Sequence, residues 1–458
     1  MDKMNIRKYR NLLALALTGI IMYSCSGEEN ISVPNGAEKQ TTLSVLFNAS
    51  QNGLEKSSGN QDVDAEKKIY SLEVLIFKSE GESEEGKLDG YGYVARQTRN
   101  VTGQTYDKEY VEIDEIKEIK LTAGKRDIYV IANAPDASFS SVKNIQEFLA
   151  KYEDLSTQGR YAHPGNVTPN PNEDLPIGGI NPSDLKTNLT MCNYAKNVVF
   201  NNLYEHHYLG YTDNNGRPSG VNPNEGWLLN DTNPFYIERL VARIAIQKID
   251  FNLPSSLPFE GISYPSSDYT YQIDSVFMLN TKINSRFAVD SQLGFVEKFG
   301  HGCKTGYSFL NSSARISNLE QSSQQANYMV EAITTPNYDI STNATPLWFY
   351  AFENEGTYPT YLVIGVRYNF QSSKDNTPKT VKSYYPILVN EPKTGKLADH
   401  DYIKRNYQYR ITAVIKGLGK LYGENPTILK SAQEADSEIE ITETVGKNLF
   451  PWTGDVYK

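Results

Sequence analysis

The hydrophobic pattern of residues 41–49 has the two-residue period of a half-buried β-strand. Leu43, Val45 and Phe47 fall on alternate positions, and Leu46 is the one exception. The segment that follows, QNGLEKSSGNQDVDAEKK, is polar and has no aromatic residue, so it buries too little surface to offset the entropy of ordering it. We therefore predict a strand that an exposed, cleavable loop joins to the fold. Its removal would leave an empty apolar slot in a sheet; an ordinary first strand with a long loop is the alternative.

Further strands and one helix are predicted in the N-terminal half. Residues 69–77 alternate apolar and polar positions, whereas residues 127–132 are apolar almost throughout, as is typical of a central strand covered on both faces. Residues 141–152 have apolar side chains at helical spacing and predict a helix. Residues 158–234 are rich in Pro, Asn and Gly, which indicates a long irregular connection with short strands.

Regular structure restarts at residues 237–251, which we interpret as a strand, with a helix as the competing interpretation. The next predicted strands are β-branched or aromatic and are bounded by turn residues: 347–353, 361–369, 383–390 and 407–415. In residues 437–445, Ile439, Ile441 and Val445 alternate with polar residues. Strands at this spacing with little helix between them predict a β-sandwich.

The N-terminus has the pattern of an export signal. Four basic residues precede an apolar run, residues 12–22, that is too short to span a bilayer comfortably. Ser24 and Cys25 follow it and resemble the lipobox of bacterial lipoproteins, in which the Cys becomes the lipidated first residue. A signal peptide without lipidation, with a chance Cys at this position, is the alternative.

Composition and charge narrow the class of protein. A chain of 458 residues is long enough for two domains of about 200 residues each. The net charge of −10 is spread along the chain, which argues against nucleic acid as a partner. Cys192 and Cys303 are interpreted as buried thiols, because nothing in the sequence places them together.

The sequence predicts no enzyme and no cofactor. It has no Gly-rich phosphate loop, no nucleophile elbow and no His-Glu-x-x-His zinc motif. A metal site at His206, His207 and Asp213 is not predicted, because adjacent residues of a strand point to opposite faces. Several aromatic residues of the Pro/Asn-rich region are interpreted as core, with a sugar- or protein-binding surface as the alternative: Tyr194, Tyr204, Tyr208, Tyr211 and Trp227.

Several segments, in this order along nearly the whole chain, resemble the fimbrillin family, the major fimbrial subunits of type V pili in Bacteroidales such as Porphyromonas and Bacteroides. They are TTLSVLFNAS, IYSLEVLIF, LTAGKRDIYVIANAP, IERLVARIAI, PLWFYAFENEG, PTYLVIGV, YYPILVN, IKRNYQYRITAVIKGLG and SEIEITETV. The resemblance implies a mainly β fold with two transthyretin-like β-sandwich domains in tandem. The expected division is a signal peptide, a lipidated propeptide with the removable strand, two sandwich domains and a donor-strand segment: residues 1–24, 25–56, 57–235, 236–435 and 436–458.

The resemblance also implies a mechanism. Family precursors are exported as lipoproteins and anchored in the outer membrane through the acylated Cys, here Cys25. A trypsin-like surface protease then removes lipid and first strand together, and the groove accepts the C-terminal strand of a neighbouring subunit. The donor residues would be Ile439, Ile441, Val445, Leu449 and Trp452. Implied partners are copies of the chain itself, anchor and tip subunits, the protease, and host proteins or glycans.

The expected cleavage loop departs from the family pattern. Family members are typically cut after Arg, but this chain has no Arg between Arg10 and Arg96. Lys56 stands just after the first strand, so we predict cleavage there by a protease that accepts Lys. If the chain is never cut at Lys56, a terminating or anchoring subunit is the alternative. Pro451 is a second departure, because proline cannot donate to a strand ladder.

Two other functions remain as alternatives to a polymerising stalk subunit. A tip or accessory subunit, or a surface adhesin that does not polymerise, would lack either the cut or a usable terminal strand. It would bind a host protein or glycan. A surface-anchored hydrolase is the more distant alternative, and converging carboxylates in a cleft would favour it.

Overall fold

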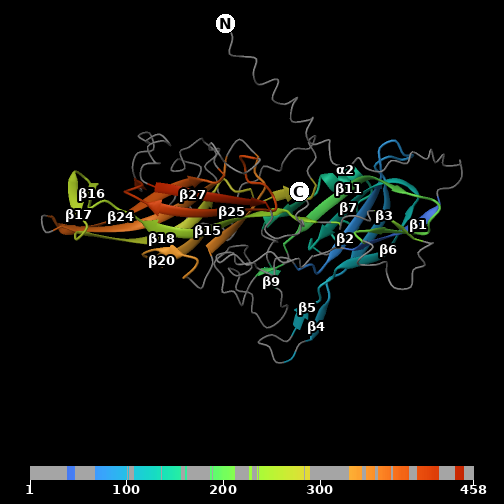
Figure 1. Ribbon diagram of the computed structural model, residues 1–458, viewed down its shortest axis with the longest axis horizontal. Coiled ribbons are helices and arrows are strands. Elements are labelled where there is room, and N and C mark those ends of the chain that lie inside the picture. Colours follow the sequence, from blue (N-terminus) through green and yellow to red (C-terminus); the bar gives the residue numbers. More distant parts are fainter. Residues whose placement is uncertain are drawn as a thin grey trace, which may run out of the picture. The chain divides into compact units, whose positions relative to one another are not determined.

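The computed structural model describes the residues that follow, all within one compact unit, Lys39–Lys458. They are 39–46, 68–100, 102, 108–135, 137–155, 160–161, 186–187, 189–211, 226–229, 235, 237–282, 284–288, 330–342, 347–355, 359–372, 375–390, 400–421 and 439–447. Within these ranges, no helix is long and apolar enough to cross a membrane. The fold is mainly β, as the sequence predicts, and consists of two sandwiches in tandem (Figure 1).

The first sandwich has a four-stranded and a five-stranded sheet. The four-stranded sheet runs in the order β13 (Gly226–Leu228), β12 (His206–Leu209), β1 (Gln40–Leu46), β6 (Glu115–Thr122). The five-stranded sheet runs in the order β14 (Glu238–Arg239), β11 (Met191–Phe200), β7 (Gly124–Ala132), β2 (Leu72–Lys78), β3 (Leu88–Val94).

The central strand of the five-stranded sheet is β7, and Ile128 to Ile131 are all buried, as their continuous apolar run predicts. The two sheets meet closely where β3 faces β6. A Cβ added at Gly92 would lie 2.6 Å from Ile119 Cγ1, and one added at Gly90 would lie 2.8 Å from the Lys120 carbonyl oxygen. Only glycine therefore fits these two positions of β3.

The second sandwich also has two sheets. One runs in the order β21 (Tyr338–Asp339), β15 (Val241–Phe251), β25 (Tyr407–Ile415), β27 (Ile439–Lys447), and β22 (Leu347–Phe352) pairs with β15 as well. The other runs in the order β20 (Val330–Thr335), β18 (Tyr269–Leu279), β23 (Tyr361–Ser372), β24 (Asp375–Leu388), β26 (Lys420–Leu421). The strand interpretation of residues 237–251 is confirmed, with an interruption at Leu240 between β14 and β15.

Four two-stranded pairs complete the strands described: β4 (Thr98–Asn100) with β5 (Lys108–Tyr110), β8 (Tyr152–Asp154) with β19 (Asn284–Arg286), β9 (Arg160–Tyr161) with β10 (Lys186–Thr187), and β16 (Ser256–Phe259) with β17 (Ile262–Pro265).

The predicted helix is shorter than its apolar pattern indicates. Helix α2 covers only Ile145–Leu149, and Asn144 caps it by accepting a hydrogen bond from the Glu147 N–H. Phe148 is its buried residue, in contact with the rings of Phe77 and Tyr129. The prediction of a helix over residues 141–152 was wrong at both ends, because turns precede Asn144 and Tyr152 already pairs with Arg286.

Candidate functional site: the slot occupied by β1

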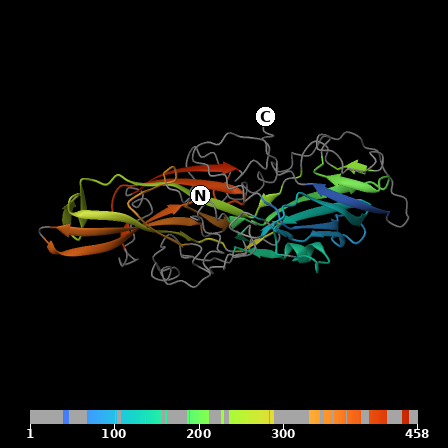
Figure 2. The same ribbon diagram turned by 90° about the horizontal axis from the view of Figure 1, so that it is seen from below.

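The first strand lies inside its sheet rather than at an edge. β1 pairs in parallel with β12, from Thr42 opposite His206 to Val45 opposite Leu209. On its other side it pairs antiparallel with β6, and Figure 2 shows the blue β1 between green and teal strands. We call the space between β6 and β12 that β1 fills the β1 slot. Removal of β1 would expose two unpaired strand edges at once.

The apolar side chains of β1 belong to the core of the first sandwich. Leu43 and Val45 are both 0% exposed and lie in the same hydrophobic cluster as residues of β2, β6 and β7. Full burial of side chains of this size contributes about 1.5–3 kcal/mol each. Phe47, the third residue assigned to the removable strand, lies outside the described residues.

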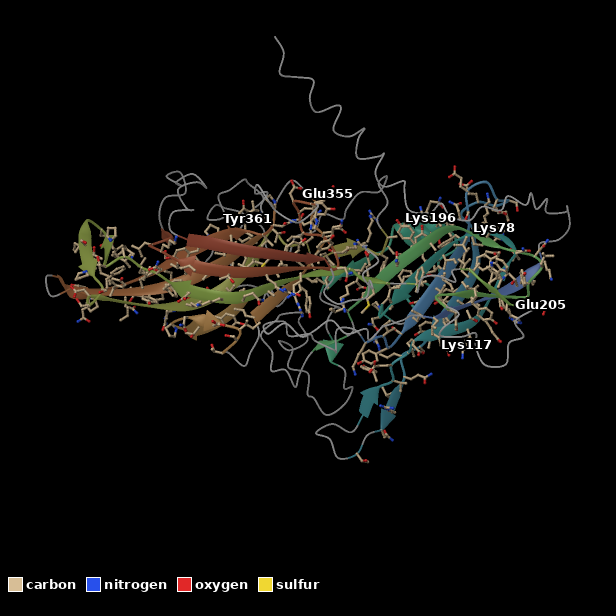
Figure 3. All side chains as sticks on the ribbon, in the orientation of Figure 1. Lys78, Lys117, Lys196, Glu205, Glu355 and Tyr361 are labelled. Carbon is tan, nitrogen blue, oxygen red and sulfur yellow. The ribbon has the colours of Figure 1, made fainter. Side chains whose placement is uncertain are left out.

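Thr41 takes part in a buried chain of hydrogen bonds to β12. The Asn201 N–H donates to His207 Nε2 over 3.1 Å, so in the neutral ring the proton is on Nδ1. His207 Nδ1 lies 2.9 Å from Thr41 Oγ1, and the Thr41 hydroxyl lies 2.9 Å from the Glu205 carbonyl oxygen (Figure 3 labels Glu205). Thr41 therefore accepts a hydrogen bond from His207 and donates one to Glu205. Only a side chain that both accepts and donates can bond to the His207 Nδ1–H and to the Glu205 carbonyl oxygen together.

Contacts at neighbouring positions fix β1 further. Thr42 Oγ1 lies 2.8 Å from His206 Nδ1, and the Thr42 N–H donates to the Glu205 carbonyl over 2.9 Å. On the β6 side, the Glu118 N–H donates to Ser44 Oγ over 3.2 Å. At the far end, a Cβ added at Gly210 would lie 2.0 Å from the Leu46 carbonyl oxygen, so glycine alone allows this approach.

His207 is held in its neutral form. Its side chain is 0% exposed and its ring lies 5.0 Å from that of Phe200. Burial, and then the neighbouring His206, lower the pKa of His207 from 6.5 to about 4. A charged imidazole at this position would also lose its ability to accept the Asn201 hydrogen bond.

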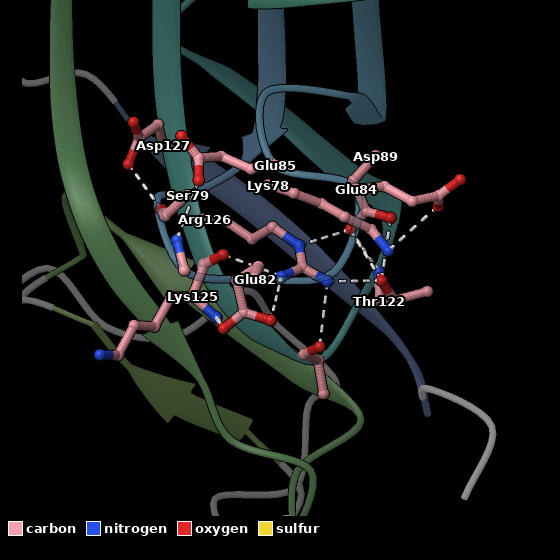
Figure 4. A network of polar contacts seen from close by, with 12 residues as sticks. Lys78, Ser79, Glu82, Glu84, Glu85, Asp89, Thr122, Lys125, Arg126 and Asp127 are labelled. Atoms are coloured by element: carbon pink, nitrogen blue, oxygen red, sulfur yellow. Dashed lines mark hydrogen bonds and ion pairs between the residues drawn. The ribbon is translucent and has the colours of Figure 1, made fainter.

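A buried ion network holds β6, one wall of the β1 slot, against the other sheet (Figure 4). Arg126 of β7 is 0% exposed and donates through Nε to Asp89 of β3 over 2.7 Å. Asp89 also accepts from the Thr122 N–H at the end of β6 over 2.9 Å, and Arg126 donates to the Thr122 hydroxyl over 2.6 Å. Thr122 is the residue paired with Gln40 of β1. The hydrogen bonds described above join β3, β6 and β7, so they support β6 from the side of the other sheet.

The C-terminal strand, β27, occupies a different kind of position. Among the described strands it is the edge strand of its sheet and pairs antiparallel with β25 alone. The register places Ile439, Ile441 and Val445 opposite Ile415, Ala413 and Tyr409, which are all buried. Leu449 and Trp452 lie outside the described residues, as do Cys25 and Lys56. The C-terminal strand is therefore paired within its own chain in this structure.

The contacts of His206 and His207 with β1 were missed in the sequence analysis. The pair was considered only as a metal site, and the structure describes no cluster of three or more His, Cys, Asp or Glu residues able to hold a metal within its described ranges. The period of a strand does not show which distant strand it pairs with, so no local signal links these histidines to Thr41.

The aromatic residues of the Pro/Asn-rich region divide between core and surface. Tyr208 and Tyr211 are buried, in agreement with a core role. Tyr194 and Trp227 are 44% and 46% exposed, and the Trp227 ring lies 5.1 Å from that of Tyr204. Cys192 is a buried free thiol whose pKa burial raises to about 12, while Cys303 lies outside the described residues.

Comparisons with known proteins agree with the resemblance found in the sequence. Residues 41–239 match the family model described as major fimbrial subunit protein (FimA). A curated relative from Parabacteroides distasonis, named as fimbrium tip subunit Fim1C, is 22% identical over 410 residues, which is 89% of this chain and 87% of the relative. The family is one of structural subunits, so the prediction of a protein that is not an enzyme is confirmed.

Solved structures show the same fold. A fimbrilin (FimA) from Porphyromonas gingivalis aligns with a TM-score of 0.51 at 17% identity and covers 89% of this chain and 97% of that one. A cell adhesion protein from Parabacteroides distasonis aligns with a TM-score of 0.51 at 19% identity, over 91% of this chain and 98% of that one. At these identities the likeness concerns the fold alone.

Proposed function

Because residues 41–239 match the family model described as major fimbrial subunit protein (FimA), we propose that the chain polymerises by exchange of strands. In this proposal β1 is cut from the folded chain and leaves the β1 slot. The C-terminal strand of a second copy then enters the slot between β6 and β12. The observation that carries the proposal is the internal position of β1, with a neighbour on each side and two fully buried aliphatic side chains.

Strand addition accounts for the stability that a fimbria requires. An incoming strand regains the ladders of both β6 and β12 and places alternate side chains in the positions of Leu43 and Val45. Each of the two buried side chains contributes about 1.5–3 kcal/mol, in addition to the main-chain hydrogen bonds. Because the donated strand and the slot are different surfaces of the subunit, the interface is heterologous and open, and it builds a filament.

Export and processing are part of the same proposal. The precursor is lipidated at Cys25, anchored in the outer membrane, and cut after Lys56 by a trypsin-like surface protease, which releases residues 25–56. The processed chain, with sandwich domains at 57–235 and 236–435 and a donor segment at 436–458, joins a fimbria on the cell surface. Anchor and tip subunits, and host proteins or glycans, are its further partners.

The edge position of β27 supports its role as the donated strand. Within the described part of the chain it pairs with one neighbour, so it can leave β25 without separating any other described pair of strands. Donor residues Ile439, Ile441 and Val445 are within this strand, and Leu449 and Trp452 follow it.

A tip or accessory subunit is the second candidate function. The relative named as a tip subunit favours it, as does the absence of any Arg in the loop between β1 and β2. A tip subunit would accept a donated strand but donate none, whereas a stalk subunit does both.

Limited proteolysis of the purified, lipid-free chain tests the proposal. A small dose of trypsin is followed by N-terminal sequencing, electron microscopy and electrophoresis of unheated samples in SDS. We expect a new N-terminus at Ser57, together with filaments or SDS-resistant ladders. Lys56→Gln should abolish both, and Lys39→Gln, which changes a lysine on the other side of β1, should abolish neither.

Other outcomes of the trypsin experiment distinguish a stalk subunit from a tip or accessory subunit. A cut at Lys56 with no multimers at any protein concentration would argue for the tip or accessory role. Resistance at Lys56 in a chain that is cut readily elsewhere would contradict the removal of β1.

A further inference from the structure

The polar contacts of Thr41 constrain which strand can occupy the β1 slot. The Thr41 hydroxyl lies 2.9 Å from the protonated Nδ1 of His207 and 2.9 Å from the Glu205 carbonyl oxygen. His207 is 0% exposed, and the Thr41 residue is 4% exposed. An apolar side chain at position 41 would leave the buried Nδ1–H donor of His207 without a partner and would remove one of the hydrogen bonds to the Glu205 carbonyl.

The next inward positions of β1 impose a second constraint. Leu43 and Val45 follow Thr41 at intervals of two and are both fully buried. A strand that replaces β1 in the same direction therefore needs a hydroxyl residue followed, two and four residues later, by aliphatic residues. A strand shifted by one residue would turn its whole apolar set to the other face.

The C-terminal segment contains this pattern once. Between residues 437 and 447, Ile439 and Ile441 are the only two aliphatic residues spaced by two, and Ser437 precedes Ile439 by two. We propose that His206 and His207 set the register of strand exchange, so that Ser437, Ile439 and Ile441 of a second copy take the places of Thr41, Leu43 and Val45. This inference rests on the proposed function, because it assumes that the C-terminal segment enters the slot.

Charge at the intervening position agrees with the same register. Glu438 would take the place of Thr42, whose hydroxyl contacts His206 Nδ1 and whose partner on β6 is Lys120. A carboxylate accepts a hydrogen bond from an imidazole as a hydroxyl does, and here it would stand between two basic residues. No other register of the segment puts a hydroxyl beside His207 and aliphatic residues at both buried positions.

Peptide binding tests the register without changing the protein. The probe is a fluorescent peptide of residues 436–447, added to the full chain after limited proteolysis has cut the loop between β1 and β2. We expect the Ser437→Ala peptide to bind at least about fivefold more weakly, since a buried partner is left unsatisfied, and the Ser437→Thr peptide to bind like the parent. Thr444→Ala is the matched control, because it removes a hydroxyl from a position beyond the three register positions.

The outcomes distinguish this inference from the proposed function. Equal binding of the parent and Ser437→Ala peptides would overturn the register and leave strand exchange standing. A loss with Thr444→Ala as large as that with Ser437→Ala would assign a different register. Failure of the parent peptide to bind would overturn strand exchange, and the register with it.

Discussion

The two strands assigned to exchange differ in how many neighbours hold them. β1 lies between β6 and β12, has two fully buried aliphatic residues, and makes side-chain hydrogen bonds through Thr41, Thr42 and Ser44. Of the strands that the structure describes, β27 pairs only with β25, at an edge. The strand to be removed is therefore the more firmly bound of the two, which explains why its departure would need a covalent cut. The strand to be donated needs none.

The largest expected effect concerns the wall of the β1 slot. Asp89→Ala should destabilise the first sandwich by about 3–5 kcal/mol, because it leaves the fully buried Arg126 without its closest carboxylate. Urea unfolding measures this loss, and hydrogen exchange should rise in residues 40–46 but not in residues 439–447. The control is Glu80→Ala, which removes an exposed carboxylate of the same region and should change little. Equal losses from the two variants would contradict a supporting role for the network.

Shortening a buried side chain of β1 is expected to cause the next largest loss of stability. Leu43→Ala should cost about 3 kcal/mol, since it removes a buried side chain and leaves a cavity in the core. Leu203→Ala is the matched control, because Leu203 is 73% exposed. Both are measured by chemical unfolding. If Leu43→Ala also increased exchange in β27, the two strands would not be independent.

Acid should loosen β1 selectively. The folded-state pKa of His207 is about 4, below its ordinary value of 6.5, so the unfolded state binds the proton more readily. The stability contributed by neutral His207 is complete above pH 6.5 and falls as the pH drops towards 4. Between pH 7 and pH 5 the loss is about 2 kcal/mol. Unfolding curves across this range measure it, and a His207→Gln variant should show a flatter pH dependence.

The smallest expected effect is that of a single hydroxyl. Thr41→Val keeps the shape of the side chain but leaves the buried His207 Nδ1–H without its acceptor, at a cost of about 1–2 kcal/mol. Thr41→Ser retains the hydroxyl and should stay close to the parent protein in urea unfolding. A Thr41→Val protein as stable as Thr41→Ser would show that water replaces the hydroxyl.

Strands with a clear hydrophobic pattern could be predicted from the sequence. The alternation of residues 41–49 and the apolar run of residues 127–132 each led to the strand that the structure has. Helix α2 was overestimated, because helical spacing beyond Leu149 gave way to pairing between Tyr152 and Arg286, which no local pattern encodes. His207 was missed for a similar reason, since its significance depends on Thr41, 166 residues away in the chain.

The C-terminal segment also shows that a sequence pattern predicts a strand but not the strand with which it pairs. Its alternation predicted a strand, and residues 439–447 form one. The alternation did not indicate β25 as its partner, because an alternating strand fits any sheet with an open edge and an apolar face. The sequence alone therefore does not choose between β25 and the β1 slot of a second copy as the partner of this strand.

The parallel pairing of β1 with β12 also has a consequence for the order of events in the life of the chain. Residues 40–46 are synthesised first, but their partner at 206–209 follows some 160 residues later, so this contact is of high contact order and forms slowly. Until β12 arrives, β1 can meet only β6. Cleavage during that interval would release β1 before the sheet exists and leave an unshaped cavity. In the proposed mechanism the protease must therefore act on a finished fold, and β1 would serve until then as an internal template for the groove that it vacates.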